Sequence, residues 1–232
     1  MNQNTNVRHL QLSNDGAASI TSQAYARMRV DILAGDLVPG RKLKIDELRN
    51  EYGIGASPIR GALSLLTSDG LVDRIDQRGF QVKQVSRQEF EELLKTRCWL
   101  EERALRESIA HADRRWEESI VLAHYRLGRV PRSDTDNRFS SNPEWEAHHK
   151  VFHHALISAC ASGILLKICD QLYDHNIRYR QIAGPSAYPG RTVGDEHEAI
   201  MAAALDLDAD LAVQQLIDHY AKTGAFVAER LN

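Results

Sequence analysis

Extended segments are confined to one short stretch of this sequence, and that restriction constrains the fold more than any other feature. Residues 71–75 and 80–85 have the composition of two short strands joined by a polar turn that contains a glycine. Beyond them, apolar residues recur at helical spacing only, and Ser86 with Glu89 forms a capping box that opens this region. The sequence therefore predicts a mainly α protein with a domain junction at residues 85–86.

The first part of the chain has the element order of a winged helix-turn-helix domain. Residues 1–18 are polar and lack sustained periodicity, which predicts a flexible tail. Ser57 and Pro58 form a strong helix start, because serine can cap free amides and proline at the first helical position needs no N–H. The helices expected before the hairpin, in a domain covering 19–85, span 19–34, 45–52 and 57–70.

The second part, residues 86–232, shows helical patterning throughout. Hydrophobic residues make up 43% of the chain, so both parts can bury a core. Long loops are expected at 128–141 and 184–191. Six antiparallel helices would pack as a bundle, and they are expected at 86–111, 113–128, 143–160, 163–183, 193–205 and 208–231.

The distribution of charge permits DNA binding by the first part. Residues 1–85 carry a net charge of +2 and residues 86–232 a net charge of −5, counting lysine, arginine, aspartate and glutamate. The three cysteines have no paired spacing, which indicates reduced thiols. The sequence shows no signal peptide and no apolar run long enough to cross a bilayer, so we expect a cytoplasmic protein without a membrane partner.

The helix that begins at Ser57 is short enough to lie in the major groove of duplex DNA. Ser57 and Pro58 would reach the groove first, with Arg60 one turn further along. At the tip of the hairpin, Arg78 and Gly79 can approach the phosphate backbone or the minor groove. Two copies in a homodimer would present their helices to successive major grooves about 34 Å apart. The alternative is a winged helix that contacts proteins, with a solvated Arg60.

Several segments of this first part together resemble the DNA-binding domain of the GntR family. The resemblance implies that Ser57 and Arg60 contact operator DNA and that Arg78 and Gly79 belong to the wing. Family members usually have an arginine just before the Ser/Thr-Pro pair, where this chain has Ala56. The segments that carry the resemblance are 38–43, 47–48, 57–63, 69–72 and 78–80.

Four histidines in the second part have the spacing of a metal site in a helical bundle. His149 and His153 lie one helical turn apart and project from one face, while His197 and His219 belong to two later helices. Imidazoles suit zinc, nickel, copper or iron. The chain has ten histidines, however, so the i,i+4 pair can also arise from composition alone.

The second part is similar to the C-terminal sensor domain of the FadR-type GntR branch, and its six helices favour the VanR-like subgroup. The resemblance implies that His153, His197 and His219 bind a divalent metal, zinc or nickel. The fourth ligand position, an aspartate in metal-binding members, is His149 here. A four-histidine site, a site completed by Glu146, and a metal-free site that holds an anion all remain open. The segments that carry this resemblance are 94–105, 152–156 and 196–200, with Asp208, Ala212 and His219.

The same resemblance implies a small organic acid as effector. Arg97 occupies the family's inward-facing arginine position and would bind the effector carboxylate. Arg178 and Arg180 are further candidates on a later helix. We therefore expect a transcriptional regulator, of the repressor type, whose operator binding an effector controls through the linker at 82–87.

Two other functions fit the same residues. A histidine-rich metal site resembles a hydrolase centre, but the sequence has neither an HExxH motif nor a Gly-x-Ser-x-Gly motif. An inert bundle that only dimerises a DNA-binding domain is the second alternative.

Overall fold

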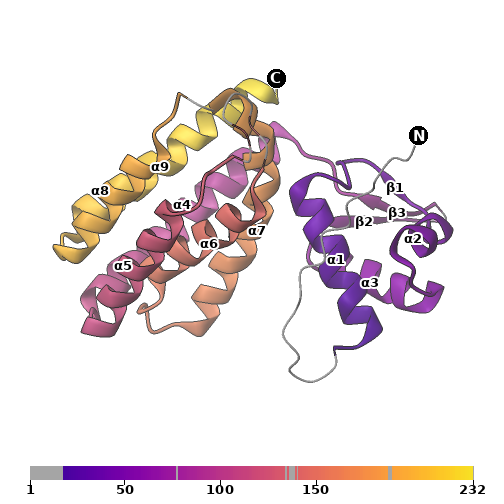
Figure 1. Ribbon diagram of the computed structural model, residues 1–232, viewed down its shortest axis with the longest axis horizontal. Helices are drawn as coiled ribbons and strands as arrows, with labels where there is room; N and C mark the ends of the chain where they lie inside the picture. The colour runs from indigo at the N-terminus through magenta and orange to yellow at the C-terminus, as the bar shows by residue number, and fades with distance from the viewer. Residues whose placement is uncertain are drawn as a thin grey trace.

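The computed structural model describes residues 18–76, 78–133, 135, 139, 141–187 and 190–231. The tail expected at 1–18 lies outside these residues except for Ala18. Figure 1 shows an elongated helical bundle beside a smaller unit that combines helices with a sheet. The predicted fold class, a mainly α protein with a winged helix-turn-helix and a six-helix bundle, is confirmed.

Within the residues that the structure describes, the smaller unit contains three helices and a three-stranded antiparallel sheet in the order β1-β3-β2. Phe80 on β3 lies opposite Leu43 of β1 on one side and Arg74 of β2 on the other. Strand β1 was not predicted, because two residues are too short to show an alternating pattern. The elements are α1 (Ile20–Ala34), β1 (Lys42–Leu43), α2 (Ile45–Tyr52), α3 (Ala56–Ser68), β2 (Val72–Ile75) and β3 (Gly79–Val82).

One hydrophobic core holds this unit together. Met28 and Ile32 of α1 pack with Leu48 of α2 and with Ile59 and Leu63 of α3, and all five side chains are buried. Burial of a side chain of this size contributes about 1.5–3 kcal/mol. The core fixes α2 and α3 relative to each other, which leaves the opposite face of α3 free to contact a partner.

The predicted cap and first residue of α3 are wrong by two positions. Gly55 is the N-cap, no side chain caps the helix, and Ala56 is its first residue. Ser57 therefore does not cap the helix, and Pro58 occupies the third helical position instead of the first. The first four amides of a helix have no partner within it, so proline is tolerated at the third position as well.

The described part of the second unit is a bundle of six helices. Ser86 caps its helix as the sequence predicts, because its Oγ accepts from the amide of Glu89 at 3.1 Å. Asn142 caps a second helix of the bundle, its Oδ1 accepting from the amide of Glu144 at 3.0 Å. Helix α7 was expected to end at 183 but continues past Pro185. The helices are α4 (Arg87–Ala110), α5 (Arg114–Gly128), α6 (Pro143–Ile157), α7 (Gly163–Ala187), α8 (Val193–Leu205) and α9 (Ala209–Arg230).

Helix α7 is the bundle helix that packs against α1 of the smaller unit (Figure 1). Asp174 of α7 forms an ion pair with Arg29 of α1. His175 Nε2 lies 2.7 Å from the carbonyl oxygen of Asp69, at the end of α3. These contacts form a polar joint between the two units. Among the described residues, no helix is long and apolar enough to cross a membrane.

Candidate functional site

The residues expected to contact DNA lie on the surface of the smaller unit. Ser57 and Arg60 are exposed at the start of α3, and Pro58 between them is half-buried. Arg78 and Gly79 are exposed at the wing. Gly79 has φ +88°, a conformation that other residues adopt only with strain, and no atom would contact a Cβ there. The start of α3 and the wing tip are therefore accessible to a large partner.

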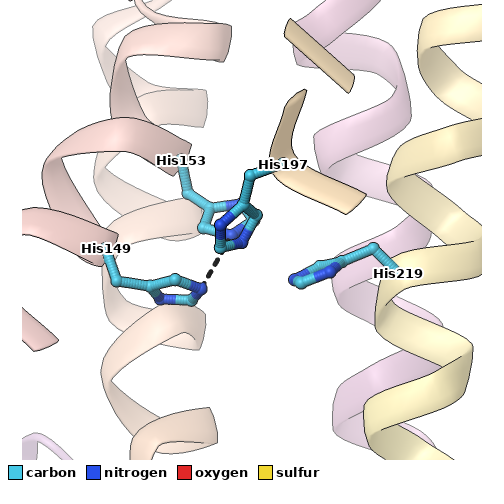
Figure 2. Close-up of side chains that lie close together, drawn as sticks. All are labelled: His149, His153, His197 and His219. Atoms are coloured by element: carbon cyan, nitrogen blue, oxygen red, sulfur yellow. Dashed lines mark hydrogen bonds between the residues drawn. The ribbon is translucent and has the colours of Figure 1, made fainter. Parts of the chain in front are cut away.

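The four histidines from three helices converge inside the bundle (Figure 2). One ring nitrogen from each of His149, His153, His197 and His219 lies within 4.8 Å of the others. All four side chains are buried, with relative exposures of 2–4%. We call these residues the histidine cluster. Four ring nitrogens this close together are a donor set that a transition metal can use.

Two of the imidazoles are oriented by acidic side chains behind them. His219 Nδ1 lies 2.7 Å from Glu196 Oε2. His153 Nδ1 lies 3.1 Å from the hydroxyl of Tyr220, which donates to Glu101. Hydrogen bonds of this kind fix the tautomer of a metal-binding histidine and the direction of its other nitrogen.

The remaining two imidazoles have different surroundings. His149 Nδ1 lies 2.5 Å from the hydroxyl of Tyr173 and 2.7 Å from Arg180 Nη1. His197 Nε2 is buried and has no hydrogen-bond partner within the described part of the chain. A buried ring nitrogen without a partner is costly unless a ligand or an ion satisfies it.

The electrostatics of the histidine cluster favour neutral rings. Burial lowers the pKa of His149 and His153 well below the usual value, with further lowering by Arg180 and His219 respectively. Burial likewise lowers the pKa of His197, and it lowers that of His219 to about 4 despite the opposing effect of Glu196. Neutral imidazoles retain the lone pairs that a metal ion needs. The donor set therefore fits a divalent metal.

The three arginines expected at the effector site are not brought together. Arg97 is fully buried and paired with Glu101, its Nη2 lying 2.8 Å from Oε1 of that carboxylate. Arg178 lies at the junction of the two units, where it donates to the carbonyl oxygen of Lys83. Arg180 alone reaches the histidine cluster, and it also donates to Glu146. Glu146 is therefore already paired with an arginine in this structure.

Two further arginines, which sequence reasoning missed, line the space beside the histidine cluster. Arg191, just before α8, contacts Glu196 at 2.6 Å and His219. Arg132 follows α5, and burial together with Arg191 and Arg180 lowers its pKa to about 10. Its Nη1 is buried without a hydrogen-bond partner among the residues that the structure describes. We call Arg132, Arg180 and Arg191 the arginine cluster.

Residues of the arginine cluster line two neighbouring spaces. A cavity of about 30 Å³ lies between the arginines and the histidine cluster and is lined by His149 and His219. A larger pocket of about 310 Å³ shares Arg132 and Arg191 with it and is lined by His197. Pockets of this larger size accommodate small organic ligands, whereas the smaller cavity holds little more than water.

The exposed helix α3 and wing, joined to a separate helical domain, are the architecture of a DNA-binding transcriptional regulator. Comparison with protein families places the chain within this class. Residues 20–82 match the model described as "Bacterial regulatory proteins, gntR family", and residues 92–222 match the FCD domain. The chain belongs to the GntR family of bacterial regulators and carries an FCD domain as its C-terminal part.

Curated relatives are regulators, not enzymes. The uncharacterized HTH-type transcriptional regulator BphR of Paraburkholderia xenovorans (strain LB400) is 34% identical over 201 residues, which cover 87% of this chain and 82% of BphR. The HTH-type transcriptional repressor GlaR of Escherichia coli (strain K12) is 29% identical over 211 residues, which cover 87% of this chain and 93% of GlaR.

Solved structures share the fold along nearly the whole chain. E. coli McbR/YncC superposes with a TM-score of 0.73 at 18% identity, covering 93% of this chain and 100% of the other. A putative GntR regulator from Rhodococcus sp. RHA1 gives a TM-score of 0.72 at 18% identity, covering 90% and 98%. At this level of identity the likeness concerns the fold alone.

Proposed function

We propose that this chain represses transcription as a homodimer on operator DNA, and that a small organic acid controls the binding from a site beside a divalent metal. The observation that carries the proposal is the buried convergence of the histidine cluster next to the arginine cluster. The sequence similarity to GlaR, which is named a repressor, supports the direction of control.

The donor set supports zinc or nickel as the metal. Imidazole nitrogen is a borderline ligand that these ions accept, whereas calcium and magnesium require oxygen. His219 with Glu196 has the carboxylate–histidine arrangement that usually stands behind a zinc ligand. Within the described residues His197 Nε2 has no partner, and an ion in the cluster would supply one.

The balance of charge supports an anionic effector. The three arginines of the arginine cluster face two carboxylates, Glu146 and Glu196, while the imidazoles are neutral. One positive charge is therefore in excess before a divalent ion adds two more. A dicarboxylate matches this excess, and the planar guanidinium groups suit bidentate contacts with carboxylate oxygens.

Helix α7 supplies the route by which the site acts on the DNA-binding unit. Tyr173 contacts His149 of the histidine cluster, and the next residue, Asp174, pairs with Arg29 of α1. Asp174 also accepts from Lys150, the neighbour of His149 on α6, at 2.9 Å. Movement of α6 or α7 on effector binding thus alters the contacts of Asp174, the same carboxylate that pairs with α1. The effector in this way shifts the equilibrium between two states that differ in DNA affinity.

Zinc followed by succinate is expected to raise the melting temperature of the bundle. A ligand present at one hundred times its Kd stabilises the folded state by about 2.7 kcal/mol, which corresponds to about 5–10 °C for a chain of this size. Tryptophan fluorescence measures the change, because all three tryptophans lie in the second part of the chain.

Succinamide, which has the same shape without the charge, is the control ligand and is expected to produce no shift. Asp174→Asn is expected to keep the succinate shift while losing the effect of succinate on DNA affinity. Equal shifts with succinate and succinamide, or none with zinc, would contradict the proposed site and favour an inert bundle.

Arg60→Ala is expected to weaken binding to a DNA sequence selected from a random duplex pool by about 1–3 kcal/mol, the contribution of one good base contact. Arg78→Ala at the wing is expected to weaken binding to all duplexes alike and to reduce the salt dependence by about one phosphate contact. Fluorescence anisotropy measures both effects, and the stoichiometry of the titration should be two chains per operator.

Arg114→Ala is the matched control for these two variants. Arg114 is an exposed arginine at the start of α5, where it pairs with Glu118. Arg114→Ala changes the net charge by the same amount as Arg60→Ala or Arg78→Ala, and it should leave DNA affinity unchanged. If Arg114→Ala weakens DNA binding as much as Arg60→Ala does, total charge governs the affinity. The assignment of α3 as the helix that contacts the bases would then be wrong.

A further inference from the structure

The hydrogen bonds around His149 have a direction that sets this residue apart in the histidine cluster. Arg180 Nη1 lies 2.7 Å from His149 Nδ1, and a guanidinium group can only donate. Arg180 Nη1 also donates to the hydroxyl of Tyr173 at 3.1 Å, which leaves that hydroxyl with its own hydrogen to give to Nδ1. Nδ1 of His149 is therefore an acceptor, and the single N–H of the neutral ring is on Nε2.

The hydrogen bonds of the neighbouring imidazole, His153, lead to the same assignment of hydrogen to Nε2 of His149. Tyr220 donates its hydrogen to Glu101, so its oxygen accepts from the Nδ1–H of His153 at 3.1 Å. His153 then presents a lone pair at Nε2, which lies 3.2 Å from Nε2 of His149 (Figure 2). His149 donates to His153 across the centre of the cluster. Arg180, which can only donate, and Glu101, which accepts, stand at the two ends of this series of hydrogen bonds. Both therefore require that the hydrogen bonds run from Arg180 towards Glu101.

At His219 an acceptor is nearer than the donor: Glu196 Oε2 lies 2.7 Å from Nδ1, whereas Arg191 Nη2 is 3.4 Å from Nδ1 and donates at shorter range to Glu196 and to the carbonyl oxygen of His219. His219 directs Nδ1 at Glu196, which can only accept when ionised, and so keeps a lone pair on its other nitrogen. His197 has a buried Nε2 without a partner in the described ranges. A histidine that binds a metal normally gives its second nitrogen to an acceptor, as His153 and His219 do. His149 has an arginine in that place.

We propose that His153, His197 and His219 form a three-histidine metal centre and that His149 is a hydrogen-bond donor to a carboxylate oxygen of the effector at the remaining coordination position. The inference rests on the proposed metal site. Three protein ligands with one open position are the usual arrangement where a metal also binds a small molecule. For His149 to become a fourth ligand through Nε2, its hydrogen would have to move to Nδ1, facing the N–H of Arg180 at 2.7 Å.

This role gives the histidine at position 149 a function that an aspartate could not perform there. An aspartate there would add a negative charge and occupy a coordination position. His149 instead directs an N–H into the centre, and Arg180 holds it in that orientation through Nδ1. The centre keeps its full positive charge and gains a donor, so both changes favour binding of an oxygen anion.

Titration of the full-length protein with cobalt(II) as a spectroscopic probe tests the inference. His149→Ala is expected to bind one cobalt ion within about tenfold of the wild-type affinity, with the same visible absorption envelope. His219→Ala is expected to lose at least about one hundred-fold. With cobalt bound, His149→Ala should bind succinate about tenfold more weakly, and His149→Gln, which retains an N–H donor, should restore succinate binding.

Each result decides between the roles. If His149→Ala loses cobalt as severely as His219→Ala, with far-UV circular dichroism unchanged, His149 is a ligand and the inference is wrong. If the wild-type protein binds no cobalt, the proposed metal function itself fails. Long-range 1H–15N spectra of the metal-free protein give an independent readout, in which hydrogen on Nε2 of His149 supports the inference and hydrogen on Nδ1 overturns it.

Discussion

Glu101→Ala is expected to destabilise the helical bundle by about 3–5 kcal/mol, the range found when one partner of a buried ion pair is removed. Glu101 and Arg97 lie one turn apart on α4, and their side chains are only 4% and 2% exposed. Burial alone would lower the pKa of Arg97, yet Glu101 raises it above its usual value, so the guanidinium stays charged in the core. Without Glu101 that charge loses the carboxylate that pairs with it, and Tyr220 loses its acceptor.

Urea unfolding followed by tryptophan fluorescence measures this loss in the bundle. Glu102→Ala is the matched control on the same helix, because Glu102 pairs with Arg106 at the surface, where an ion pair contributes less than about 1 kcal/mol. Replacing Arg97 by Met and Glu101 by Leu together should recover more than half of the loss, since well-packed apolar residues substitute for a buried pair. Equal effects of Glu101→Ala and Glu102→Ala would show that Arg97 is not held in the core by its partner.

The helices could be predicted from the sequence because each carries its own local signals. Ser86 caps its helix as expected, and Asn142 caps α6 with the same kind of local hydrogen bond. Helix α8 has the predicted bounds, and α7 differs only at its C-terminal end, where Gly184 and Pro185 suggested a break that packing overrides. Start and stop signals act over a few residues, so a single sequence contains them.

The histidine cluster could be predicted only in part. The one-turn spacing of His149 and His153 placed them on one face, but the choice of His197 and His219 among ten histidines came from family resemblance. The structure brings these four together. The direction of the hydrogen bonds at His149 depends on Arg180, which is on another helix, and no sequence pattern contains that contact.

The arginines were harder to assign, for physical reasons. Arg178 and Arg180 are two positions apart on α7, about 200° around a helix, so they cannot both face one site. Arg132 and Arg191 lie outside regular helices, where no periodicity indicates the direction of a side chain. The spacing of Arg97 and Glu101, i and i+4, was a readable signal for a pair, and the structure places their ion pair in the core.

Acid is expected to unfold the metal-free bundle over an unusually narrow range of pH. Burial lowers the pKa of all four imidazoles of the histidine cluster, three of them well below 6.5 and that of His219 to about 4. Below pH 6.5 the unfolded chain takes up protons that the folded chain does not, so the free energy of unfolding falls as the pH falls. Each imidazole contributes about 1 kcal/mol between pH 6.5 and 5.5, where the unfolded histidine becomes protonated, so the four together contribute about 4 kcal/mol over this range.

Urea titrations in the presence of a chelator at a series of pH values measure this slope through tryptophan fluorescence. His219→Gln removes one of the four protons and should reduce the slope by about one quarter, whereas His154→Gln, at an exposed histidine on α6, should leave it unchanged. Glu196 acts in the same direction at lower pH, because its hydrogen bonds with His219 and Arg191 lower its pKa despite its burial. If the slope of the free energy of unfolding against pH corresponds to the uptake of one proton or fewer, the imidazoles are already hydrated or charged in the folded protein. The histidine cluster would then be a hydrated polar pocket and not a group of buried, neutral imidazoles. In that case the argument for a metal at this position would fail.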